Sequence, residues 1–164
     1  MKQQDYYNDF RKYVYWLGDA VPNNMQAEAI DFLLKCPDNY VEYIIDTANP
    51  YTWKNAAEII KKIGYPRNRM ASKNIMYLFQ DINWECSKTA LDILNEIYIH
   101  ESCLVKEILE NVVKIAEKHD DKEWLFGLSY VKEALSISKT DFKNPDTVKL
   151  LFKGDYWDSY DEIT

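Results

Sequence analysis

The residue types that most often carry chemistry are few and widely separated in this chain of 164 residues. There are two histidines, His100 and His119, and three cysteines, Cys36, Cys86 and Cys103. Neither histidine stands at metal-ligand spacing from a cysteine, and there is no Cys-x-x-Cys pair. A Cys–His dyad would therefore require the fold to bring distant residues together by coincidence. We predict reduced, partly buried thiols, no metal and no cofactor.

Motifs that bind phosphate or position a nucleophile are also missing from the sequence. It contains no glycine-rich phosphate loop, no Gly-x-Ser-x-Gly and no His-Glu-x-x-His. The 27 Asp and Glu residues are numerous, but they are scattered over the polar faces of the expected helices. The sequence therefore predicts a protein that is not an enzyme.

Charge is unevenly distributed along the chain. The formal net charge is −7, and a net negative charge disfavours general binding to nucleic acid, because phosphate neutralisation supplies most of that affinity. Between residues 51 and 80, however, six Lys and Arg stand against one acid. Two interpretations are open: a solvated face that complements acidic neighbours, or a patch for an acidic partner or nucleic acid, with Tyr65 and Tyr77 available for stacking. The candidate basic patch consists of Lys61, Lys62, Arg67, Arg69 and Lys73.

The C-terminal segment 154–162 interleaves four acidic residues with three aromatic ones. One interpretation is an end segment whose aromatic side chains pack on the last helices. The other is a hook for a basic protein surface, because Tyr and Trp are favoured anchors of interfaces. The candidate partner-binding residues are Tyr156, Trp157, Asp158, Tyr160 and Asp161.

Apolar residues recur at helical spacing along almost the whole chain. Trp53, Ala56, Ala57, Ile60 and Ile63 form one such stripe, and residues 90–98 and 105–116 contain two more. With 4 Gly and 5 Pro, the chain has few of the residues that form the many turns of a β-sandwich or barrel. We predict one all-α domain of eight or nine short antiparallel helices, joined by connections of about three to six residues.

One phrase recurs at the expected helix starts. Asp81-Ile-Asn-Trp84 and Asp121-Lys-Glu-Trp124 share the pattern Asp-x-x-Trp, and Asn49-Pro-Tyr-Thr-Trp53 is similar. The tryptophans are 31 and 40 residues apart, which is typical of helix-pair repeats that stack to bury a continuous core. The favoured interpretation is that Asp caps the helix while Trp is buried. The alternative is a row of exposed tryptophans on a ligand-binding face.

The segment Asn55-Ala-Ala-Glu-Ile-Ile-Lys-Lys-Ile-Gly-Tyr-Pro66, together with both Asp-x-x-Trp phrases, resembles a bacterial family of small HEAT-like helical domains. The resemblance covers residues 53–139. It implies a right-handed α-α superhelix of stacked helix pairs, and it defines no catalytic residue. We accordingly expect cap helices in residues 1–49, a repeat core in residues 50–139, and a C-terminal helix with the acidic aromatic tail in residues 140–164.

These observations predict a cytoplasmic module that binds a protein partner through an acidic and aromatic face, to which a basic partner surface is complementary. The N-terminus lacks the apolar core of a signal peptide, and no stretch approaches the roughly 18 apolar residues of a transmembrane helix. We expect a monomer or a weak homodimer. One alternative is an immunity-type inhibitor of a cationic bacterial toxin. Another is a nucleic-acid binder or an enzyme like the helical-repeat DNA glycosylases, which this class of fold resembles, using the basic block 54–73.

Overall fold

The computed structural model describes residues 3–152, and in this range every regular element is a helix. The predicted all-α class is confirmed. The α-helices are α1 (Gln3–Tyr15), α2 (Asn23–Leu34), α3 (Trp53–Ile63), α4 (Ser72–Ile75), α5 (Glu85–Lys118), α6 (Lys122–Ala134) and α7 (Pro145–Leu151). Between them lie the 3₁₀ helices η1 (Asp38–Ile44), η2 (Pro50–Thr52), η3 (Arg67–Ala71), η4 (Met76–Phe79) and η5 (Lys139–Asp141).

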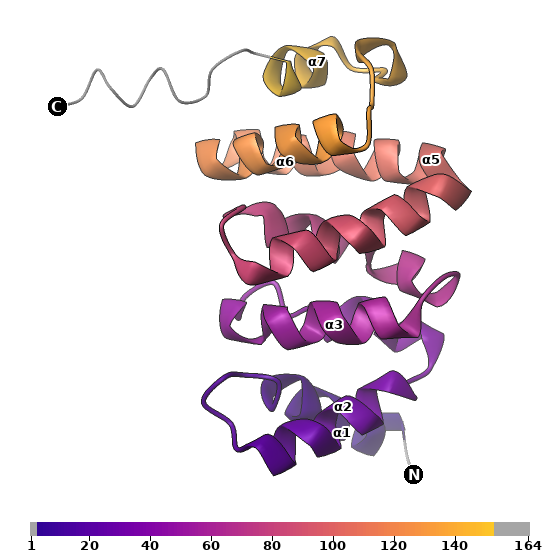
Figure 1. Ribbon diagram of the computed structural model, residues 1–164, viewed down its shortest axis with the longest axis vertical. Helices are drawn as coiled ribbons and strands as arrows, with labels where there is room; N and C mark the ends of the chain where they lie inside the picture. The colour runs from indigo at the N-terminus through magenta and orange to yellow at the C-terminus, as the bar shows by residue number, and fades with distance from the viewer. Residues whose placement is uncertain (1–2, 153–164) are drawn as a thin grey trace, which may run out of the picture.

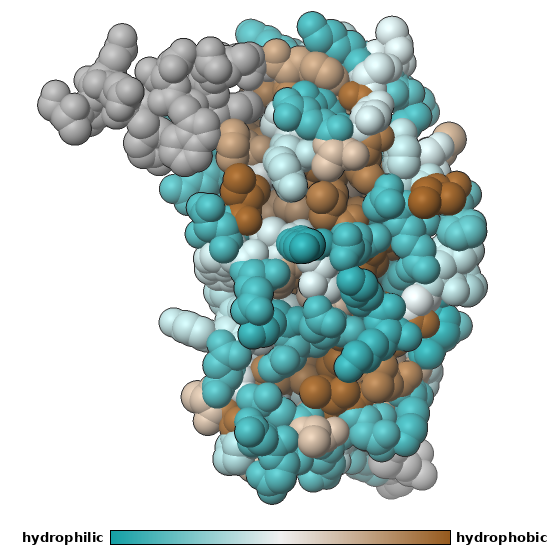
Figure 2. Space-filling model, in the orientation of Figure 1, coloured by the Kyte–Doolittle hydropathy of each residue, from teal (hydrophilic) through white to brown (hydrophobic). Residues whose placement is uncertain are grey.

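The helices are stacked in chain order along the long axis of the molecule (Figure 1). Contacts join α1 to α2, α2 to α3, α3 to α5, α5 to α6, and α6 to α7, so each layer packs against the next one in the chain. The buried apolar residues form one continuous cluster through these layers. Hydrophilic side chains cover much of the face seen in Figure 2, with apolar ones gathered in patches between them. This layered stack is what a helical-repeat sequence predicts; a HEAT-like superhelix stays a prediction.

Helix α5 consists of two helical halves, as the two apolar stripes predict, but they meet at a kink and not at a short loop. Its 34 residues are interrupted only by Glu101, whose backbone is non-helical at φ −138° and ψ 60°. The two halves run in different directions (Figure 1). Glu101 Oε1 accepts hydrogen bonds from the Tyr65 hydroxyl and from Arg69 Nη1, both at 2.9 Å. Contacts from residues 65–69 therefore hold the bend, where the sequence has neither Gly nor Pro to mark it.

Side chains that donate to backbone carbonyl groups connect distant parts of the chain. A carbonyl oxygen has two lone pairs, so a side-chain donor can bind it in a turn or near a helix end even where a backbone N–H already does, as Asn49 N does at Asp46 O. Tryptophan and asparagine side chains do so here. The bonds run from Trp53 Nε1 to Asp46 O (2.8 Å), Trp124 Nε1 to Met76 O (2.9 Å), Asn55 Nδ2 to Leu17 O (2.7 Å) and Asn74 Nδ2 to Glu42 O (2.6 Å).

Helix α6 approaches η4 closely at Gly127. A Cβ atom built on Gly127 would lie 1.9 Å from Phe79 O and 2.9 Å from Phe79 C. Phe79 is fully buried, so its backbone cannot move aside without disturbing the core. Glycine is therefore required at this position by contact, not by backbone conformation.

We expect Gly127→Ala to lower the free energy of unfolding by about 3 kcal/mol, because the added methyl group overpacks the contact with Phe79. Gly18→Ala is the matched control, since the nearest atom to its added Cβ is Tyr15 O at 3.6 Å. Urea denaturation of both variants checks this. Equal stability of the two variants would contradict the close approach of α6 to η4.

An ion pair attaches η5 to α5. Lys106 Nζ lies 2.7 Å from Asp141 Oδ1, while Asp141 Oδ2 accepts from Ser138 N at 2.9 Å and from Ser138 Oγ at 3.0 Å. The bond from Lys106 and the two bonds from Ser138 favour the ionised carboxylate, and they lower the pKa of Asp141 from 3.8 to about 2.

Because the pKa of Asp141 is lower in the folded chain than its ordinary value, this carboxylate stabilises the fold above about pH 4, and the stabilisation is lost as the pH falls toward 2. We expect Asp141→Asn to flatten this part of the dependence of unfolding free energy on pH. Lys106→Met should reduce the same slope, since it removes the largest cause of the shift. Chemical denaturation at a series of pH values measures the slopes; an unchanged slope in Asp141→Asn would refute the assignment.

Candidate functional site

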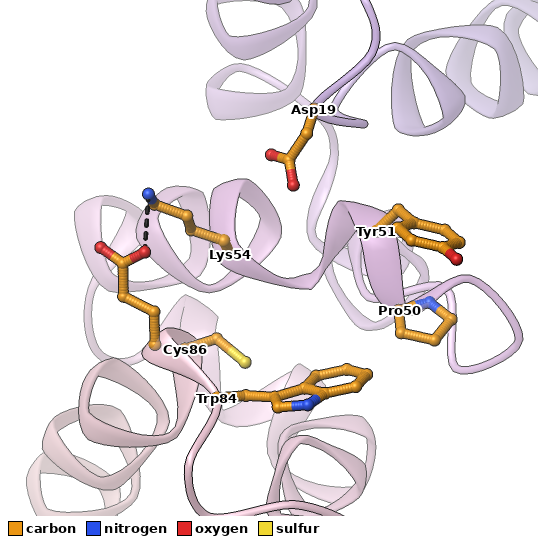
Figure 3. A pocket seen from close by; sticks show the side chains of 7 residues that line it. Asp19, Pro50, Tyr51, Lys54, Trp84 and Cys86 are labelled. Carbon is orange, nitrogen blue, oxygen red and sulfur yellow. Dashed lines mark ion pairs between the residues drawn. The ribbon is translucent and has the colours of Figure 1, made fainter.

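A groove of about 430 Å³ lies where successive layers of the stack meet. Its residues come from three places: the connection between α1 and α2, the segment formed by η2 and the first turn of α3, and the start of α5 (Figure 3). The lining residues are Asp19, Pro50, Tyr51, Lys54, Trp84, Glu85 and Cys86. Residues as far apart in sequence as Asp19 and Cys86 therefore share one surface.

Two large aromatic side chains are exposed in this groove. Tyr51 is 77% exposed and Trp84 is 37% exposed, and the ring of Pro50 lies between them (Figure 3). The Trp84 ring lies 4.9 Å from that of Trp53, which is only 1% exposed. Trp53 thus fills the core beneath Trp84, and Trp84 stays at the surface.

The recurring Asp-x-x-Trp phrase is used in two different ways. At α6, Asp121 is the N-cap, its Oδ1 accepts from Trp124 N at 2.9 Å, and Trp124 is buried. At α5, Trp84 itself takes the N-cap position with extended backbone, and Asp81 Oδ1 accepts from Asn83 N at 2.8 Å in the preceding turn. The buried interpretation is therefore right for Trp124 and wrong for Trp84.

The groove contains one basic side chain, Lys54, and two acidic ones, Asp19 and Glu85. Lys54 Nζ pairs with Glu85 Oε2 at 2.8 Å, and this bond, helped by the charges of Asp19 and Glu58, raises the pKa of Lys54. Asp19 is exposed and makes no hydrogen bond or ion pair with the described residues. The groove therefore keeps an uncompensated negative charge. Burial raises the pKa of the Cys86 thiol to about 11, so this cysteine is neutral and unsuited to act as a nucleophile.

The predicted basic patch is largely neutralised by acids from other elements. Lys61 pairs with Asp92 (2.7 Å), Arg67 with Asp38 (2.6 Å) and Arg69 with Glu101 (2.9 Å), and Arg67 also donates to Cys36 O. Lys62 and Lys73 are exposed and have no ion pair within residues 3–152. These contacts favour the interpretation of a solvated face that complements acidic neighbours.

The two tyrosines expected to stack on bases are engaged within the protein. Tyr65 stacks on His100, with ring centroids 4.2 Å apart and planes at 13°, and donates to Glu101. Tyr77 packs against Trp124 with a centroid distance of 4.5 Å. Neither ring is arranged as a free platform for nucleotides. The other predicted surface, Tyr156, Trp157, Asp158, Tyr160 and Asp161, lies outside the described residues and stays a prediction.

The cysteines, for which no metal or catalytic role was predicted, differ in exposure. Cys36 and Cys86 are buried and Cys103 is exposed, and all three thiols are free. Among residues 3–152, no three His, Cys, Asp or Glu side chains gather in a way that could hold a metal ion. No helix of this part of the chain is both long and apolar enough to cross a membrane.

A second depression, of about 490 Å³, lies at the turn between α5 and α6. Five consecutive residues, 119–123, line it, so it combines no side chains from different layers. Asp121 in this turn already serves as the N-cap of α6. The groove at Tyr51 and Trp84 is therefore the stronger candidate site.

Comparison of the chain with protein-family models, curated proteins and solved structures finds no match. The resemblance to a bacterial HEAT-like family stays a prediction. The candidate site is therefore argued from its own geometry.

The predicted site residues did not include Tyr51 and Trp84, although the sequence contained a signal that these two side chains are exposed. Tyr51 stands outside the stripe of Trp53, Ala56 and Ile60, and Trp84 falls in the gap between two apolar stripes. A large aromatic residue outside every stripe has no predicted place in the core. Asp19 and Glu85 carried no comparable signal, because isolated acids are common in this chain.

We expect Tyr51→Ser to change the free energy of unfolding by less than about 0.5 kcal/mol, because the side chain is mostly exposed. Trp53→Ala is the buried comparison, and it should cost about 4 kcal/mol. Urea denaturation measures both values. A cost for Tyr51→Ser approaching that of Trp53→Ala would show that Tyr51 serves the fold and not the surface.

Proposed function

We propose that this chain is a non-enzymatic helical-repeat module that binds another protein, and that the groove around Tyr51 and Trp84 is its contact surface. One observation carries the proposal. Two large aromatic side chains from different layers are exposed together on one groove, while Trp53 and Trp124 are buried. Tyr and Trp are the residue types most often found at the energetic centre of protein interfaces.

The openness of the groove favours a protein over a small molecule. Binding sites for small molecules enclose most of the ligand surface. Tyr51, at 77% exposed, extends outward from the groove and leaves it unenclosed on that side. A broader partner could cover Tyr51 from outside and place a single side chain in the groove. A stack of layers is suited to this, because it holds residues from distant parts of the chain in a fixed arrangement.

Charge argues against nucleic acid as the partner. Residues 3–152 contain 18 Lys and Arg against 23 Asp and Glu, and Lys61, Arg67 and Arg69 are already paired. A neutral or basic protein is the better match to this surface. An immunity-type inhibitor is one form of the proposal, in which the basic partner is a toxin.

The three free thiols support the cytoplasmic location that the proposal includes, since reducing compartments keep cysteines unpaired.

The test compares capture of partners by the tagged full chain and two variants, with captured proteins quantified by mass spectrometry. Tyr51→Ser combined with Trp84→Ser removes both exposed rings. Tyr130→Ser is the matched control, because Tyr130 is 43% exposed on α6 and does not line the groove. We expect one protein to be captured by the wild type and by Tyr130→Ser, and to fall by about tenfold or more with the double variant.

Retention of that protein by the double variant would contradict the assignment of the groove. Recovery of nucleic acid in place of protein, lost as salt is raised, would contradict the proposed class of partner. Circular dichroism of the variants checks that each remains folded.

A further inference from the structure

We infer that the groove recognises an arginine side chain of a basic partner, with the guanidinium against the rings of Trp84 and Tyr51 and paired with the carboxylate of Asp19. The inference rests on the proposed function, because it names the chemistry of the partner at the same groove. Three features of the groove support it: the aromatic walls, the unpaired acid and the neutral floor.

The aromatic walls are suited to a cation. The π-face of Trp, and to a lesser degree that of Tyr, attracts a positive charge placed over it. The indole N–H groups of Trp53 and Trp124 donate to backbone carbonyls, whereas that of Trp84 makes no hydrogen bond to the described residues. The polar edge of Trp84 is thus left for a carbonyl group of the partner, beside the side chain that occupies the groove.

The unpaired acid supplies the charge complement. Lys54 and Glu85 neutralise each other at 2.8 Å, which leaves the carboxylate of Asp19 directed into the groove without a partner (Figure 3). An anionic ligand would be repelled by Asp19. An apolar side chain would take Asp19 out of water without pairing it, which is costly. A cation both fills the groove and compensates this charge.

Arginine fits this combination better than lysine does. Its planar guanidinium stacks on aromatic faces and forms two parallel hydrogen bonds to one carboxylate. The ammonium group of lysine is compact and more strongly hydrated, so it loses more on leaving water. The floor of the groove is the buried, protonated thiol of Cys86, which adds no competing charge.

The experiment follows the Trp84 indole N–H resonance of the ¹⁵N-labelled full chain during titration with N-acetyl-arginine amide. N-acetyl-citrulline amide is the matched probe, because it has nearly the same shape without the charge, and N-acetyl-lysine amide tests the preference for guanidinium. We expect saturable shifts with a dissociation constant on the order of 10 mM for arginine. Binding should be about threefold weaker for lysine and about tenfold weaker for citrulline.

Two variants locate the charge that is recognised. Asp19→Asn should weaken arginine binding by about fivefold to tenfold and leave citrulline binding unchanged, because it removes only the carboxylate charge. Asp146→Asn removes the same charge on α7, far along the stack, and should have no effect. Titrations at about 150 mM salt suppress long-range attraction to the acidic chain.

Equal binding of arginine and citrulline, an Asp19→Asn variant that binds arginine as the wild type does, or no saturable shift up to about 50 mM would each overturn the inference. These results are separable from the proposed function. If a captured protein depends on Tyr51 and Trp84 but arginine fails to bind, the inference is wrong and the proposed function stands. If arginine binds while no captured protein depends on the groove, the proposed function is wrong.

Discussion

The stack depends on hydrogen bonds from buried tryptophan side chains to backbone carbonyl groups in turns and short 3₁₀ helices. Trp53 and Trp124 form these bonds with single indole N–H groups, which donate to Asp46 O and Met76 O. Each indole has only one donor, so the carbonyl that it binds also fixes where its ring lies. The layers are therefore held at defined positions by polar contacts inside an otherwise apolar core.

The groove is a consequence of this arrangement. Trp53 is fixed beneath the surface by its bond to Asp46 O, and Trp84 lies against its ring at 4.9 Å. The core position at this level of the stack is therefore already filled, and Trp84 lies over it. Tyr51 precedes Trp53 in η2 and is carried to the same edge. The residues of the candidate site are thus positioned by a residue that is itself buried and outside the site.

Local pattern in the sequence was sufficient to predict the helices, the buried stripe of Trp53, Ala56 and Ile60, and the helix start at Asp121. It could not distinguish Trp84 from Trp124, because the difference arises from contacts outside the phrase. Ser87 donates to Leu78 O and Asp81 O, both at 3.1 Å, and so ties the first turn of α5 to the preceding segment. The two interpretations of the basic block could not be separated for a similar reason: its acids come from residues about 30 positions away, which periodicity does not reveal.

The candidate site lies where the two Asp-x-x-Trp phrases differ, and this difference follows from packing. If the Trp of every Asp-x-x-Trp phrase were buried as Trp124 is, each would contribute only to the core. The surface at the helix starts would then be polar. At α5 the Trp takes the N-cap position instead, and its ring reaches the surface near Glu85, the first residue of α5, and Asp19, in the connection between α1 and α2. Aromatic area and negative charge then meet in one groove. Two copies of one short phrase thus give one buried residue, Trp124, and one surface residue, Trp84, in the same stack.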